Sequence, residues 1–116
     1  MPNILAIETS SDACSVALSF ENEISSFHEI APQKHTEKLF GFIQELMKER
    51  RLKFSQLDAV AVGHGPGSFT GIRLACSAAQ GIAYSAGISA ISVSSMEVVA
   101  QYANSKIKQK DIVVLV

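Results

Sequence analysis

The chain has 116 residues, of which 47% are hydrophobic and 18% are charged, and its formal net charge is −1. This composition excludes a disordered polypeptide and a protein that holds nucleic acid through a broad basic surface. No apolar run approaches the roughly 20 residues that a membrane-spanning helix needs, and the N-terminus has no signal-peptide pattern, so we expect a cytoplasmic domain with its own core.

The first thirty residues predict three antiparallel strands. Residues 4–7 form a short apolar run that is typical of a buried strand. Residues 14–20 alternate apolar and polar side chains, which predicts a strand with one buried face. A polar turn precedes residues 24–30, so the third strand is expected to form a meander with the first two.

The rest of the chain alternates helices and strands. Residues 36–51 place apolar side chains along one helical face, and residues 70–84 are apolar almost all round. Strands are predicted at 58–62 and 88–93, the first of them apolar on both faces as in a parallel sheet. A capping-box pattern opens a last helix over 94–103. The prediction is an α/β fold of order β-β-β-α-β-α-β-α, a mixed sheet with helices on both faces.

A further apolar strand is predicted at residues 111–116. A strand with nothing after it suggests that a second lobe begins there. We therefore expect one lobe over residues 1–110, with 111–116 as the first strand of a truncated second lobe.

The loop between the strand at 58–62 and the helix at 70–84 is the most specific segment, with the sequence GHGPGSFTG over residues 63–71. Its glycines permit close backbone approach, and its hydroxyls and the free amides at the helix start are suited to an anion. No lysine follows the last glycine, so the loop is not a Walker A sequence. A phosphate site and a plain tight connection both remain open.

A second polar cluster, ETSSD at residues 8–12, follows the first strand. Such a turn suits a phosphate, but its residues are also those that a hairpin turn needs. The candidate nucleotide-binding residues of the two segments are Glu8, Thr9, Ser10, Gly65, Gly67, Ser68 and Thr70.

The sequence predicts no metal site. Glu8 follows one strand whereas Asp58 precedes another, so parallel strands would hold the two carboxylates about 15 Å apart, too far for a two-metal centre. A helical metal pair would need a second ligand four residues after His35, and that residue is Leu39. The two cysteines have no metal-ligand spacing and are expected to be reduced core residues.

Three segments together resemble the TsaB (YeaZ) family of bacterial threonylcarbamoyladenosine synthesis on tRNA. They are ILAIETS at 4–10 followed by ACSVAL at 13–18, then VGHGPGSFTGIR at 62–73, then VSS at 93–95. The resemblance runs the full length of the chain. Because members of the family are longer, it implies that this chain corresponds to their N-terminal lobe.

The resemblance implies an actin-like, ribonuclease H-like ATPase fold and a role without catalysis of its own. Its implied main partner is TsaD, which transfers threonylcarbamoyl to the adenosine 3′ to the anticodon, with TsaE as a further partner. The implied tRNA contact is only through the complex, with no cofactor required by this chain beyond weak ATP or ADP binding there. An ATP-dependent phosphotransferase of the same fold is the alternative, and a glycoprotease-like metallopeptidase is a less favoured one.

The apolar faces of the first two helices are explained equally well by a core and by a protein interface. The resemblance favours the interface, because it implies pairing through these helices with TsaD, or with a second copy when TsaD is absent. The implied partner-binding residues are Leu39, Phe40, Ile43, Met47, Ala75, Ala78, Ala79 and Ile82.

Overall fold

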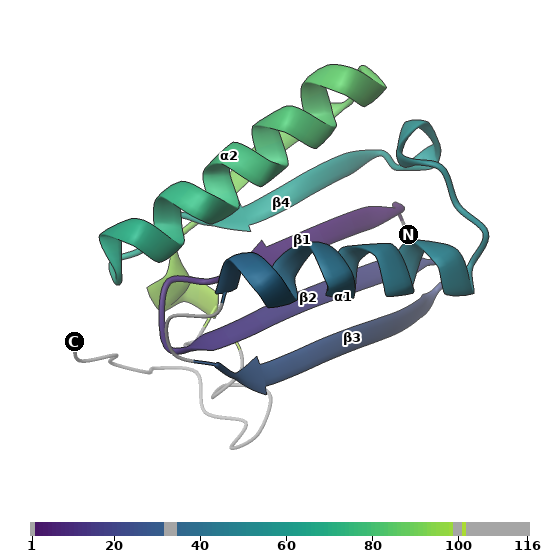
Figure 1. Ribbon diagram of the computed structural model, residues 1–116. Coiled ribbons are helices and arrows are strands. Elements are labelled where there is room, and N and C mark those ends of the chain that lie inside the picture. Colours follow the sequence, from purple (N-terminus) through teal and green to yellow (C-terminus); the bar gives the residue numbers. More distant parts are fainter. Residues whose placement is uncertain (1, 32–34, 99–100, 102–116) are drawn as a thin grey trace.

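The computed structural model describes residues 2–31, 35–98 and 101, which form a five-stranded sheet and two long helices (Figure 1). The elements in chain order are β1 (Ile4–Glu8), β2 (Ala13–Phe20), β3 (Glu23–Ile30), α1 (His35–Glu49), the 3-10 turn η1 (Phe54–Gln56), β4 (Ala59–Gly63), α2 (Phe69–Ala86) and β5 (Ser89–Val93). The predicted order is confirmed through β5.

The last predicted helix is described in part, with residues 95–98 and residue 101 helical. The predicted strand at 111–116, and with it the expected second lobe, lies outside the described residues. In the part of the chain that the structure does describe, no helix has both the length and the apolar character to cross a membrane.

The sheet is mixed, as predicted, with strand order β3-β2-β1-β4-β5. β1 pairs antiparallel with β2, and β2 antiparallel with β3. β1 pairs parallel with β4, and β4 parallel with β5. Consequently the C-terminal ends of β1, β4 and β5 lie side by side at one end of the sheet.

One face of the sheet holds the core. Alternate residues of β1, β2 and β4 are buried on this face beneath α1 and α2, and Phe27 of β3 stacks on Phe42 of α1 with ring centroids 5.0 Å apart. The buried strand residues of this core are Leu5, Ile7, Cys14, Val16, Leu18, Val60 and Val62.

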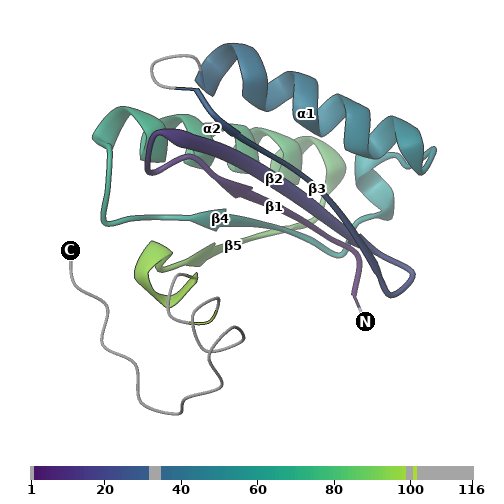
Figure 2. The ribbon, with the colours of Figure 1, turned by 90° about the horizontal axis from the view of Figure 1, so that it is seen from below.

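Both long helices lie on this same face (Figure 2). The predicted helices on both faces are confirmed through the helical turn at 95–98, because its Val98 lies on the opposite face of the sheet. The connections run from β3 to β4 and then from β4 to β5, in one direction across the sheet, and right-handed crossovers that run in one direction place their helices on one side.

The second face of the sheet carries smaller and more polar side chains. Ala6, Ala17 and Ala61 line a shallow hollow of about 340 Å³ there, to which Val98 in the helical turn after β5 also contributes. Small side chains on this face explain why β4 looks apolar on both sides in the sequence.

Both cysteines are free, as expected. Cys14 is buried in the core, and Cys76 is half-buried. Burial raises the pKa of the Cys14 thiol, and the negative charge of Glu29 raises it further, so this thiol stays protonated at neutral pH.

Ile43 and Phe40 belong to the same apolar stripe of α1 but differ in exposure, so their truncation should separate core from surface. Ile43 is 2% exposed and Phe40 is 46% exposed. We expect Ile43→Ala to lower the free energy of unfolding by about 2–5 kcal/mol. Phe40→Ala should lower it by about 1 kcal/mol or less. Urea denaturation measures both, and equal losses would contradict the assignment of Phe40 to the surface.

Candidate functional site

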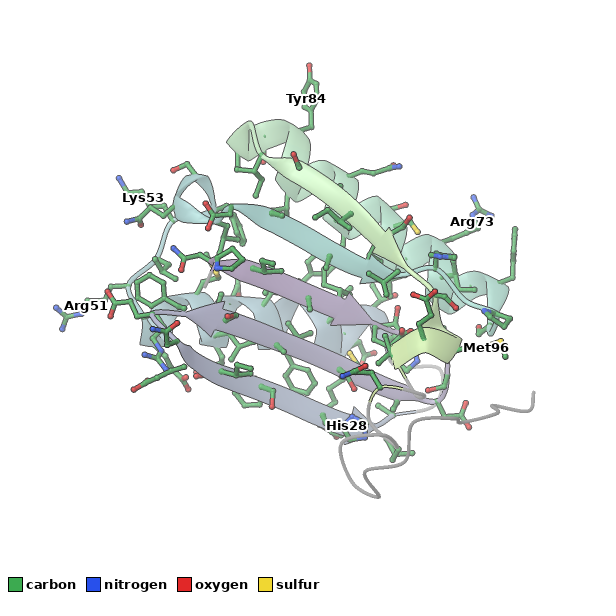
Figure 3. The ribbon with its side chains drawn as sticks, turned by 180° about the vertical axis from the view of Figure 1, so that it is seen from behind. His28, Arg51, Lys53, Arg73, Tyr84 and Met96 are labelled. Atoms are coloured by element: carbon green, nitrogen blue, oxygen red, sulfur yellow. The ribbon has the colours of Figure 1, made fainter. Side chains whose placement is uncertain are left out.

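Three segments that are far apart in the sequence meet where β1, β4 and β5 end. They are the turn at 8–12, the glycine loop at 63–71 and the pair Ser94 and Ser95 after β5. Figure 3 shows the turn around Met96 at this edge, beyond the arrowheads of the parallel strands. These are the segments that carry the sequence resemblance, so the fold gathers them into one cluster.

The carboxylate of Glu8 holds this cluster together. Its Oε1 accepts a hydrogen bond from the Ser10 N–H at 3.0 Å, and its Oε2 accepts one from the Ser95 hydroxyl at 2.9 Å. The Ser95 Oγ in turn accepts from the Gly65 N–H at 3.1 Å, and the Ser95 N–H donates to the Gly65 carbonyl at 3.0 Å. Gly63 makes room for the carboxylate, since a Cβ there would overlap it.

Two further glycines pack directly on the turn after β1. A Cβ at Gly67 would overlap the carbonyl oxygen of Ser10, and one at Gly71 would overlap the carbonyl oxygen of Thr9. The Thr9 hydroxyl also donates to the Gly71 carbonyl at 2.6 Å. These glycines therefore allow the turn after β1 to pack closely on the glycine loop and the start of α2. Their spacing in the sequence would be the same if they bound a phosphate.

The structure thus brings the seven predicted nucleotide-binding residues to one end of the sheet. Several of their polar groups, however, already form hydrogen bonds within the chain. Thr9 and Ser10 are buried, and both hydroxyls hydrogen-bond within the protein. Ser68 and Thr70 remain exposed and available to a ligand. Gly67 is exposed as well, and nucleotide binding stays a prediction that rests on these three residues.

A polar cleft of about 350 Å³ lies between the N-terminal ends of α1 and α2. Ser68 forms part of it and caps α2, accepting a hydrogen bond from the Gly71 N–H at 3.2 Å. On the α1 side, the His35 Nε2–H donates to the Ser11 carbonyl at 2.6 Å. The residues that line the cleft are Ser11, Asp12, His35, Thr36, Ser68, Thr70, Gly71 and Leu74.

The carboxylates are separated as expected. Asp58 lies at the opposite end of the sheet from Glu8, where its Oδ2 accepts a hydrogen bond from the Asn3 N–H at 2.6 Å. Among the described ranges, no three His, Cys, Asp or Glu side chains are gathered so that they could hold a metal ion.

The predicted partner surface divides into five core residues and three that line a groove, and of these three Phe40 is exposed, Ile82 is half-buried and Ala78 is 7% exposed. Most of its residues pack on the sheet and are at most 6% exposed, namely Leu39, Ile43, Met47, Ala75 and Ala79. The structure buries these five side chains in the chain's own core, which leaves them almost no surface to offer a partner. The apolar stripe of each helix packs on the sheet of its own chain. A stripe that contacted a partner would have the same helical spacing in the sequence.

The rest of the predicted surface lies in a groove between α1 and α2 of about 320 Å³. Phe40, Ala78 and Ile82 are the predicted residues that line it. The sequence interpretation missed the other lining residues, Leu74, Ser77, Gly81 and Ser85. Ser77, Gly81 and Ser85 recur every fourth residue, and this spacing of small residues was the available signal.

Alanine substitutions at two glycines of α2 should have opposite effects. Gly71→Ala forces a methyl group into the Thr9 carbonyl, and we expect a loss of about 1–3 kcal/mol in unfolding free energy. Gly81 has open space around it, so Gly81→Ala should gain about 0.5–1 kcal/mol from helix propensity. Urea denaturation of both variants is the measurement, and a Gly71→Ala protein as stable as the unmodified chain would contradict the packing described here.

Comparisons with known proteins agree with these features. Residues 20–116 match the family described as "TsaD: tRNA N6-adenosine threonylcarbamoyltransferase". The chain is 41% identical to the tRNA threonylcarbamoyladenosine biosynthesis protein TsaB of Haemophilus influenzae, over 86% of this chain and 42% of that protein. It is 40% identical to TsaB of Buchnera aphidicola, over 97% of this chain and 51% of that protein.

Among solved structures, YeaZ from Pseudomonas aeruginosa aligns with a TM-score of 0.87 at 38% sequence identity, covering 91% of this chain and 50% of that one. The chain thus spans about half the length of the relatives that it matches. The α/β architecture with its mixed sheet agrees with the predicted actin-like fold. The chain belongs to the TsaD family, and within it to the TsaB (YeaZ) proteins that its sequence motifs resemble.

Proposed function

We propose that this chain serves the synthesis of threonylcarbamoyladenosine on tRNA as a docking subunit for TsaD. In this role it supports the transfer of threonylcarbamoyl to the adenosine 3′ to the anticodon without catalysing the transfer. The names of its relatives support the pathway. The observation that carries the docking role is the apolar groove between α1 and α2, which remains open after the core is formed.

The groove has the composition of a protein interface. All of its described lining residues are uncharged, and Phe40, with 46% of its surface exposed, stands at its α1 side. On the α2 side, Ser77, Gly81 and Ser85 present little side-chain bulk, so a partner helix can approach the backbone closely. Depletion of charge with an aromatic anchor is typical of the centre of an interface.

The contacts between the turn at 8–12, the glycine loop and Ser95 support a docking role over a catalytic one. Both oxygens of the Glu8 carboxylate accept hydrogen bonds from the chain itself, and Thr9 and Ser10 are buried. These groups act as structural ties between segments. The proposal accordingly gives the chain no required cofactor, weak ATP or ADP binding in the complex, TsaE as a second partner and tRNA contact only through the complex.

In the absence of TsaD, the same groove is proposed to hold a second copy of the chain. An uncharged surface with small residues on one helix and an aromatic ring on the other is suited to pairing with itself about a twofold axis.

Two arginine substitutions test the groove. Gly81 lies in it, and Gly41 lies outside it, on the side of α1 next to Phe27 of β3. Both glycines have open space around the Cβ position, so both variants should fold. We expect Gly81→Arg to weaken binding to purified TsaD by about 30-fold or more, the effect of losing an interface centre. Gly41→Arg should change the affinity by less than about twofold. Calorimetry measures both.

Failure of the unmodified chain to bind TsaD, or equal affinities of the two variants, would contradict the proposal. Circular dichroism of each variant checks that its fold is retained. Ile43→Asp is not a suitable test, because Ile43 is buried and a charge there would disrupt the core.

A further inference from the structure

A fully buried threonine follows β1 and contacts the first turn of α2. We infer that Thr9 is a positioning residue for the groove between α1 and α2, acting through the first turn of α2. The inference rests on the docking role proposed above. Thr9 is 0% exposed, and its hydroxyl is one of few buried polar side chains in the described core.

Thr9 touches α2 in two ways. Its hydroxyl donates to the Gly71 carbonyl at 2.6 Å. Its own carbonyl lies so close to Gly71 that a Cβ on that residue would overlap it. The two contacts join residues that are 62 positions apart and leave the first turn of α2 little freedom to slide along β1.

A third tie is made by the backbone alone. The N–H of Ser68, the N-cap of α2, donates to the Ser10 carbonyl at 2.6 Å. Substitution of a side chain leaves this bond in place. The Thr9 hydroxyl is therefore the tie that can be removed selectively, and Thr9→Val removes it with almost no change in side-chain shape.

Movement of the first turn would be transmitted to the groove. Leu74, at the near end of the groove, is three residues beyond Gly71, about 4.5 Å along the helix axis. Toward its far end, α2 is held by packing on the core, where Ala79 is 0% and Ala83 is 6% exposed. A shift at Gly71 would thus swing the near end of the groove relative to Phe40, while the end near Ser85 moves least.

The test compares Thr9→Val, which keeps the shape, with Thr9→Ser, which keeps the hydroxyl. We expect Thr9→Val to raise the dissociation constant for TsaD by about three- to tenfold, because a smaller fraction of molecules holds α2 in the binding arrangement. Thr9→Ser should stay within about twofold of the unmodified chain. Hydrogen exchange of the free chain should be faster at amides 70–75 in Thr9→Val and unchanged in Thr9→Ser.

A third variant separates positioning from general stability. Ile43→Val removes one buried methyl group from α1 without touching the start of α2, so it lowers stability yet should leave the dissociation constant unchanged. An equal loss of affinity in Ile43→Val and Thr9→Val would overturn the inference.

The outcomes also distinguish the inference from the docking role. If Gly81→Arg weakens binding while Thr9→Val binds as the unmodified chain does, the inference is wrong and the docking role stands. If the unmodified chain does not bind TsaD, the docking role is wrong. In that event unchanged exchange at amides 70–75 in Thr9→Val overturns the positioning of α2 as well.

Discussion

The contact between the turn after β1 and the start of α2 is the constraint on which the rest of this structure depends. β1 and β4 are parallel neighbours, so the segments that follow them leave the sheet side by side. Both must turn within the same small space, and Gly67 and Gly71 make this possible because they bring backbone against backbone. The Glu8 carboxylate then links this turn to Ser95, and Ser95 bonds to Gly65. The segments that follow β1, β4 and β5 are thus joined to one another.

The position of α2 has consequences for the whole helical layer. α2 packs its alanine-rich side on the sheet, and α1 packs its larger apolar residues beside it. Since both crossovers run the same way across the sheet, the two helices share one face, and a groove remains between them. The glycine loop contacts the start of α2, and the groove lies along the same helix. The position of α2 therefore affects both.

Periodicity predicted the elements well because each is an amphipathic segment that forms locally. The alternation over 14–20 and the helical spacing over 36–51 correspond to β2 and α1 within one or two residues. The glycine loop and the turn at 8–12 lie together because β1 and β4 are parallel neighbours, a pairing that the structure shows. The roles of Thr9 and Gly71 were not predictable, since a glycine that approaches a ligand and one that approaches the backbone leave the same sequence pattern.

The sequence by itself determined the order of the elements, the mixed sheet, the family and the polar segments that are candidates for a site. The tertiary structure alone decided which apolar residues remain exposed. Ile43 and Phe40 look equivalent in an apolar stripe, yet the sheet buries one and leaves the other at the groove. It also decided that α1 and α2 share a face, because that depends on the spatial order of the strands and on the handedness of their connections, neither of which periodicity contains.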